Sequence, residues 1–170
     1  LAAGGSTRFG APKQLLDYRG KPLVRHAAEI ALASGCAKVI VVVGANAPQI
    51  VGALAKLPVE FIENPRWAEG MGTSIQAGIR AVEALGLPGA ILALADQPLI
   101  TPAILRHLAE EHQRTGKPIV TSQYAGTVGV PVYFAQSHFA PLLALAPDQG
   151  CKGVILKQGD AALRIACPEA

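Results

Sequence analysis

The sequence predicts an α/β fold: a mostly parallel, doubly wound sheet with helices on both faces, in three layers. Short β-branched runs alternate along the chain with longer stretches of helical period, an order typical of parallel sheets. The strand-like runs, such as Lys38–Val43, are continuously apolar, which indicates burial on both faces. The chain has 170 residues, of which 51% are hydrophobic and 16% charged, so residues 1–170 are expected to form one domain with a compact core.

The N-terminal elements follow from glycine and proline positions. Leu1–Ala3 is expected to be the last part of a strand, and Gly4–Gly20 a long glycine-rich loop. Pro22 favours the first turn of a helix that ends near Gly35.

Turn residues delimit the remaining elements, with Asp96 ending one strand and Thr101 capping a helix that has Pro102 at its first position. The further strands are expected at Lys38–Val43, Val59–Ile62, Ala90–Ala95 and Ile119–Thr121. The further helices are expected at Ala47–Lys56, Gly72–Leu85 and Thr101–Arg114. Shorter elements are expected at Val130–Phe134, Ser137–Leu145, Lys152–Lys157 and Ala162–Ala166.

Composition argues against several classes of protein. The net charge is +3 and the basic residues are scattered, so nucleic acid is a poor candidate partner. No apolar stretch is long enough to cross a bilayer. The three cysteines and four histidines match neither a disulfide framework nor a zinc site, which favours reduced thiols in a cytoplasmic protein.

Three polar segments directly follow predicted strands: Gly4–Lys13, Asn64–Ser74 and Asp96–Pro98. Ligands of open α/β sheets bind outside the carboxyl ends of the strands. We therefore expect the three segments to converge on one edge of the sheet.

The first segment has the composition of a phosphate-binding loop. Its glycines allow backbone N–H groups to approach phosphate oxygens, and Arg8 and Lys13 add positive charge. The spacing matches neither a Walker loop, because Ala11 stands where the lysine belongs, nor a dinucleotide fingerprint. A flexible loop with incidental charges is the alternative.

The other polar segments each allow two readings. Asp96 could hold Mg²⁺, which prefers oxygen ligands, or could be a turn-forming aspartate. Thr73 and Ser74, at a helix start, could contact a nucleotide or simply cap the helix. Gly126–Val132 could line an acceptor pocket or form a hairpin.

Together these segments resemble the molybdenum cofactor nucleotidyltransferase family (MobA-like NTP transferases), most closely its cytidylyltransferase branch, which joins CTP to molybdopterin. The resemblance extends over essentially the whole chain and implies a Rossmann-like nucleotidyltransferase fold. The motifs that carry it are Leu1–Gly5 with Arg8, Gly10 and Lys13; Asn64-Pro65 with Trp67 and Glu69–Ser74; Leu94–Pro98; and Gly129–Pro131.

The resemblance implies a transfer of CMP from CTP to molybdopterin or a related phosphorylated acceptor, with release of pyrophosphate. It implies that Arg8, Lys13 and Asp96 are catalytic and that Asp96 binds Mg²⁺. The nucleotide-binding residues would be Leu1, Ala2, Ala3, Gly4, Gly5, Arg8, Gly10, Lys13, Gly72, Thr73 and Ser74. The acceptor-binding residues would be Gln97, Gly129 and Pro131.

Base preference, partners and rival functions follow from the same resemblance. Ala3 stands where guanylyl-transferring relatives tend to carry glycine, which favours CTP over GTP. A molybdoenzyme could receive the product. The family usually closes with an Asp-x-Asp-Thr-Pro segment, which residues 1–170 do not contain. The alternatives are a sugar-phosphate nucleotidyltransferase and a non-catalytic nucleotide-binding accessory protein for molybdoenzyme maturation.

Overall fold

The computed structural model describes residues 1–6, 10–124 and 126–167. Its strands are β1 (Asp17–Tyr18), β2 (Lys21–Pro22), β3 (Ile40–Val43), β4 (Glu60–Glu63), β5 (Gly89–Leu92), β6 (Ile119–Tyr124), β7 (Thr127–Ala135) and β8 (Ala162–Ala166). Its α-helices are α1 (Leu23–Ala33), α2 (Ala47–Ala53), α3 (Met71–Ala84), α4 (Pro102–Thr115), α5 (Phe139–Leu143) and α6 (Lys152–Lys157). Short 3-10 helices lie at Lys13–Leu15, Trp67–Glu69, Gln136–His138 and Gly159–Ala161.

The N-terminal segment Leu1–Ala3 joins two sheets into one. The Ala2 N–H donates to the Val42 carbonyl of β3 at 2.9 Å. On the other side, the Leu1 carbonyl accepts from the Ala95 N–H at 3.2 Å, beyond the end of β5. The order across the sheet is therefore β4-β3-(1–3)-β5-β7-β6-β8, with β7 antiparallel to β5 and β6.

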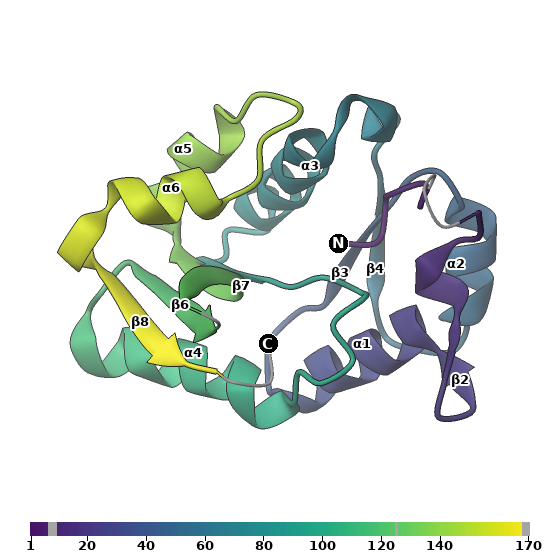
Figure 1. Cartoon of the computed structure of the whole chain (residues 1–170), viewed down its shortest axis with the longest axis horizontal. Coiled ribbons are helices and arrows are strands. Elements are labelled where there is room, and N and C mark those ends of the chain that lie inside the picture. Colours follow the sequence, from purple (N-terminus) through teal and green to yellow (C-terminus); the bar gives the residue numbers. More distant parts are fainter. Residues whose placement is uncertain (7–9, 125, 168–170) are drawn as a thin grey trace.

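Helices cover both faces of this sheet (Figure 1). The α3, α5 and α6 helices lie on one face and α1 and α4 on the other. The larger core lies under α3 and α5, where Ile79, Phe134 and Leu142 have no exposed surface. The α4 face is filled by a smaller cluster that includes Leu108 and Val120.

The predicted fold class is confirmed, with one antiparallel strand added to the parallel ones. The strand predicted at Ala90–Ala95 ends at Leu92, which forms the last pair with Val132 of β7. The Val130 carbonyl, which belongs to the next hydrogen-bonded position of an antiparallel ladder, accepts from the Gln97 side chain instead. The loop predicted at Gly4–Gly20 contains a 3-10 helix and half of the β1–β2 hairpin. In the described part of the chain, no helix is both long and apolar enough to cross a membrane.

The Leu1 amino group lies inside the sheet in this arrangement, at a half-buried residue. It donates to the Ala93 carbonyl at 2.6 Å. Burial lowers its pKa from 8.0 to about 6, although the nearby Asp96 carboxylate acts in the opposite direction. The folded chain therefore holds a proton on this amine less tightly than the unfolded chain does.

This shift predicts a pH-dependent stability for the 170-residue chain with a free Leu1 amine. Between pH 8 and about 6 the unfolded state binds a proton that the folded state does not, so stability falls as pH falls through this window. The expected loss is about 3 kcal/mol, at about 1.4 kcal/mol for each unit of pKa shift. Urea unfolding at a series of pH values measures it. The Nα-acetylated chain is the control, and parallel pH profiles for the two chains would contradict the assignment.

Candidate functional site

The predicted convergence at one edge of the sheet is seen between the first loop and Asp96. Leu1–Ala3 and residues 93–95 run side by side, and each is followed directly by a polar segment. The exposed Lys13 and the exposed Asp96 therefore belong to the same edge. Arg8 lies outside the described residues.

The two ends of the first loop are held together by Gln14, which is 7% exposed. Its Nε2 donates to the Gly4 carbonyl at 2.8 Å and to the Ala2 carbonyl at 3.4 Å. The Ser6 hydroxyl accepts from the Lys13 N–H at 3.0 Å and donates to Gln14 Oε1 at 3.4 Å. These bonds hold Lys13 close to the start of the loop that it closes.

Gly5, near the start of the first loop, packs against the Trp67 ring. A Cβ added at Gly5 would come within 3.0 Å of the ring, and one at Gly44 within 2.7 Å of the Trp67 Cβ. Glycine at both positions lets the loop, the end of β3 and the indole pack closely. In the described part of the chain, no hydrogen bond engages the N–H groups of Gly4 and Gly5, which remain able to donate to a ligand.

The start of α3 is tied to the end of β4 by the buried Asn64. Its Nδ2 donates to the hydroxyls of Thr73 and Ser74, both at 2.9 Å. The Thr73 hydroxyl has one hydrogen to donate, and the Gly70 and Arg66 carbonyls are both within reach as acceptors, at 2.8 and 2.9 Å. Both hydroxyls therefore have structural partners, although neither caps the helix by accepting from a backbone N–H.

Gly72 also has a structural function, because its N–H donates to the Pro147 carbonyl at 2.8 Å. A Cβ there would come within 2.2 Å of the Ala146 carbonyl oxygen. The nucleoside contacts predicted for Gly72–Ser74 stay a prediction.

Beside Asp96, Gln97 connects this edge to the β6–β7 hairpin. Its Nε2 donates to the Val130 carbonyl at 3.1 Å. Its Oε1 is buried and has no hydrogen-bond partner among the residues the structure describes. Gly126–Val132 is part of this hairpin, so the hairpin reading is confirmed.

A cavity of about 220 Å³ lies between this hairpin and α3. Its walls are mostly apolar, and among the residues that the structure describes its lining includes no carboxylate, amide or imidazole side chain. The lining residues are Leu1, Met71, Ile75, Leu92, Leu94, Tyr124, Thr127, Val128, Gly129, Val130, Gly150, Cys151 and Lys152. Of the predicted acceptor residues, Gly129 lines it, whereas the buried Pro131 and the half-buried Gln97 do not.

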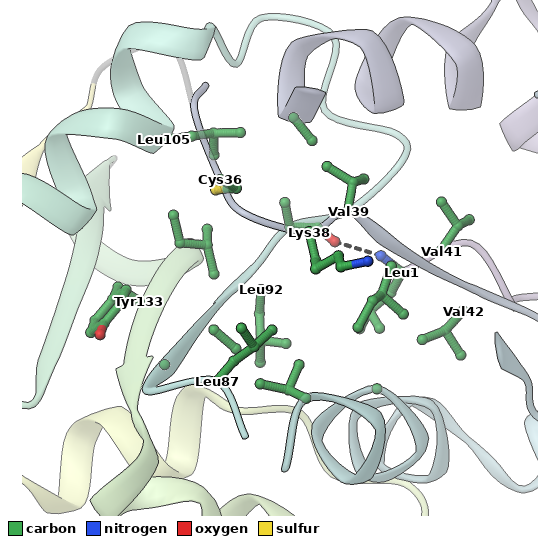
Figure 2. Close-up of a pocket in the computed structure, with 18 of the residues that line it drawn as sticks. Leu1, Cys36, Lys38, Val39, Val41, Val42, Leu87, Leu92, Leu105 and Tyr133 are labelled. Atoms are coloured by element: carbon green, nitrogen blue, oxygen red, sulfur yellow. Dashed lines mark hydrogen bonds between the residues drawn. The ribbon is translucent and has the colours of Figure 1, made fainter. Parts of the chain in front are cut away.

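A larger cavity, of about 400 Å³, lies inside the sheet and not at its edge. Figure 2 shows Leu1 on one side of it and Tyr133 on the other, with Val39, Val41 and Leu92 among its walls. We call this cavity the interstrand slot.

No cluster of three metal-ligating side chains occurs in residues 1–6, 10–124 and 126–167. Asp96 is thus a single exposed carboxylate. The Cys151 thiol is unsuited to act as a nucleophile near neutral pH, because burial raises its pKa to about 11.

Sequence reasoning missed Gln14, and it named Asn64 and Trp67 as motif residues without identifying their contacts. Gln14 carries no motif signal, since a glutamine after a lysine is ordinary on a surface. Asn64 stands directly after β4 and before a proline, and a small amide there is a recognisable signal for a buried anchor.

Comparison with known proteins agrees with this geometry. The profile of the MobA-like NTP transferase domain matches residues 1–162. Nicotine blue oxidoreductase of Paenarthrobacter nicotinovorans is 36% identical over 97% of this chain and 78% of its own length. Purine catabolism protein PucB of Bacillus subtilis is 29% identical over 94% of this chain and 79% of its own.

Among solved structures, Rv0371c of Mycobacterium tuberculosis superposes with a TM-score of 0.85 at 28% identity, covering 98% of this chain and 85% of that protein. A second structure of Rv0371c, in complex with manganese, has a TM-score of 0.80 at 26% identity, over 98% of this chain and 84% of that one.

The contribution of the Gln14 hydrogen bonds can be tested with Gln14→Leu, which approximately keeps the side chain's size and removes these bonds. The buried carbonyls of Ala2 and Gly4 would lose a donor, at an expected cost of about 1–3 kcal/mol in the free energy of unfolding. We expect nucleoside triphosphate binding, measured by calorimetry, to weaken at least about fivefold as the loop loosens. Gln136→Leu, at an exposed position, is the control. Unchanged stability and binding in Gln14→Leu would show that the Gln14 hydrogen bonds are dispensable.

Proposed function

Because this chain belongs to the MobA-like NTP transferase domain family, we propose that it transfers CMP from CTP to molybdopterin or a related phosphorylated acceptor. The observation that supports this most is the shared edge of the sheet. A glycine loop with available N–H groups, the cation of Lys13 and the carboxylate of Asp96 follow neighbouring parallel strands there. A polyphosphate between them would meet donors on one side and a metal ligand on the other.

In the proposed reaction, the acceptor phosphate attacks the α-phosphorus in line and pyrophosphate leaves. The protein contributes position and charge, and no side-chain nucleophile is needed. Lys13 and Arg8 would stabilise the charge that gathers on the leaving pyrophosphate. Gln14 and Trp67 would hold the loop so that its N–H groups need not reorganise during the reaction.

The residues present fit a divalent metal that keeps most of its water. One exposed carboxylate, together with substrate phosphates and waters, is a usual ligand set for Mg²⁺. A bound Mg²⁺ would neutralise charge on the phosphate oxygens. We propose Asp96 as its protein ligand, in line with the manganese complex of Rv0371c.

CTP is the proposed nucleotide substrate, in preference to GTP. The Ala3 side chain is only 3% exposed. Its influence on the base would therefore act through the position of the loop backbone.

The 220 Å³ cavity is the proposed acceptor pocket. A hexose would need amide or carboxylate partners for its hydroxyl groups, and the lining has none. Apolar walls between α3 and the hairpin suit a flat heterocycle, while the exposed Lys152 could meet a phosphate. This favours a pterin-type acceptor over a sugar phosphate. A molybdoenzyme receiving the product stays part of the proposal.

The second candidate is a reductase, because a relative 36% identical over nearly the whole chain is named nicotine blue oxidoreductase. The same loop would then hold a nicotinamide nucleotide as hydride donor, and the apolar pocket a flat aromatic acceptor. Incubation with CTP and molybdopterin, followed for pyrophosphate, and with NADPH and a quinone-type dye, followed for NADPH absorbance, separates the two. Tight CTP binding with neither reaction would favour an accessory protein.

Removal of either charge should slow pyrophosphate release. We expect Lys13→Ala to lower kcat/KM for CTP at least about tenfold, equal to about 1.4 kcal/mol of transition-state stabilisation. Asp96→Asn should lower it similarly and should also weaken Mn²⁺ binding to the CTP complex, as measured by electron paramagnetic resonance. Lys157→Ala and Asp160→Asn, which alter exposed charges elsewhere, are the controls. Full activity in both Lys13→Ala and Asp96→Asn would refute the proposed reaction.

A larger side chain in the proposed acceptor pocket should raise the KM for molybdopterin and not the KM for CTP. Met71 is 49% exposed and lines the cavity, so Met71→Trp should raise the KM for molybdopterin at least about tenfold and leave the KM for CTP within about twofold. Steady-state kinetics with each substrate varied in turn measures both. Leu156→Trp, at a position 53% exposed on α6, is the control. Equal changes in both KM values would place the acceptor elsewhere.

A further inference from the structure

Tyr124, at the end of β6, is the one aromatic residue among the described residues that line the 220 Å³ cavity. It is half-buried, and in the described part of the chain no hydrogen bond engages its hydroxyl. The other polar side chains of the lining are Thr127, Cys151 and Lys152. Tyr124 therefore brings to a mostly apolar pocket an aromatic ring together with a hydroxyl that is available to a ligand.

The position of this hydroxyl accounts for the glycine at residue 129. A Cβ at Gly129 would lie 2.6 Å from the Tyr124 Oη, but 3.5 and 3.8 Å from the nearest ring carbons, which is ordinary van der Waals contact. Gly129 does not have the positive φ that favours glycine, so space and not backbone conformation is the constraint here. The missing side chain therefore makes room for the Tyr124 hydroxyl beside the cavity that Gly129 lines.

The backbone around Gly129 is fixed by two buried hydroxyls of β6. The register of the β6–β7 ladder shifts between Thr121 and Ser122. At this irregularity Thr121 Oγ1 donates to the Gly129 carbonyl at 2.9 Å, and Ser122 Oγ donates to the Pro131 carbonyl at 2.8 Å. Both side chains are at most 1% exposed. A bulge secured by buried bonds holds Gly129, and with it the space for the Tyr124 hydroxyl, in one position.

The same hairpin is connected to the edge of the sheet that carries Asp96. Gln97 donates from Nε2 to the Val130 carbonyl at 3.1 Å, and Val130 lines the cavity next to Gly129. A ligand in contact with Tyr124 would therefore lie in a pocket whose wall is bonded to the residue after the proposed metal ligand.

We propose that Tyr124 determines which acceptor the 220 Å³ cavity binds: its ring packs against the acceptor's heterocycle, and its hydroxyl forms a hydrogen bond with a ring nitrogen or an exocyclic group at the heterocycle's edge. The ligand class is a flat, conjugated heterocycle with hydrogen-bonding edges, such as a pterin. A ring without the matching group would leave the hydroxyl unpaired in a desolvated pocket, which gives selectivity. The inference rests on the proposed function, because it names the residue that recognises the acceptor in the proposed pocket.

The test measures the binding of neopterin monophosphate, a fluorescent pterin that carries one phosphate, to the 170-residue chain and its variants without CTP. Tyr124→Phe removes only the hydroxyl and should raise the dissociation constant at least about threefold. Tyr124→Leu also removes the ring and should raise it at least about fivefold further. Tyr18→Phe, at a half-buried tyrosine outside the cavity, is the control and should leave it within about 1.5-fold.

A tyrosine that only covers Gly129, as aromatic rings cover glycines on neighbouring strands, needs no hydroxyl. Unchanged binding in Tyr124→Phe would therefore overturn the inference, as would an absence of neopterin monophosphate binding in the parent chain. Steady-state kinetics with CTP and molybdopterin separates this result from the proposed reaction. Binding that depends on Tyr124 without pyrophosphate release would support the inference and refute the reaction. Pyrophosphate release with an unchanged KM for molybdopterin in both Tyr124 variants would overturn the inference and leave the reaction standing.

Gly129→Ala gives an independent result through a double-mutant cycle with Tyr124→Phe. In the parent chain the new methyl group would meet the hydroxyl, so the ring must move and the dissociation constant should rise at least about threefold. In Tyr124→Phe the closest ring carbon lies at 3.5 Å from the added Cβ, and the same substitution should change the constant less than about 1.5-fold. Equal effects of Gly129→Ala in the two backgrounds would contradict the position assigned to the hydroxyl.

Discussion

The parallel pairing of Leu1–Ala3 with β3 on one side and residues 93–95 on the other is the constraint on which the rest of the structure depends. Without these hydrogen bonds the β3–β4 pair and the four strands from β5 to β8 form separate sheets. With them, the glycine loop and Asp96 leave the sheet from adjacent strands at the same edge. The proposed site for a polyphosphate at this edge therefore follows from strand order, before any side chain is considered.

Buried polar side chains then fix what the sheet brings together. Gln14 closes the loop onto its own first residues, and Asn64 connects the end of β4 to the start of α3. Both are largely buried and hydrogen-bonded, a combination that specifies one arrangement because a lost partner is costly inside a protein. Thr73 and Ser74 belong to this framework, so the polar residues of this motif have structural hydrogen bonds.

The two cavities differ in what they can do. The cavity between α3 and the hairpin opens beside the edge that carries Asp96, whereas the interstrand slot lies within the sheet, enclosed by helices from both faces. Size alone would select the slot as the functional site. Its position among the strands, away from the edge that carries the glycine loop and Asp96, argues against that role.

The sequence by itself determined the fold class, the order of the main elements and the edge where the glycine loop and Asp96 meet. Continuous β-branched runs and terminal glycines and prolines are local signals that survive without tertiary information. The extra length of β6 and β7, the end of β5 at Leu92 and the role of Gln14 were decided only by tertiary structure. Strand pairing and buried hydrogen bonds depend on a partner distant in sequence: beyond Leu92 the Val130 carbonyl accepts from Gln97 and not from β5, and the carbonyls of Ala2 and Gly4 give Gln14 its function.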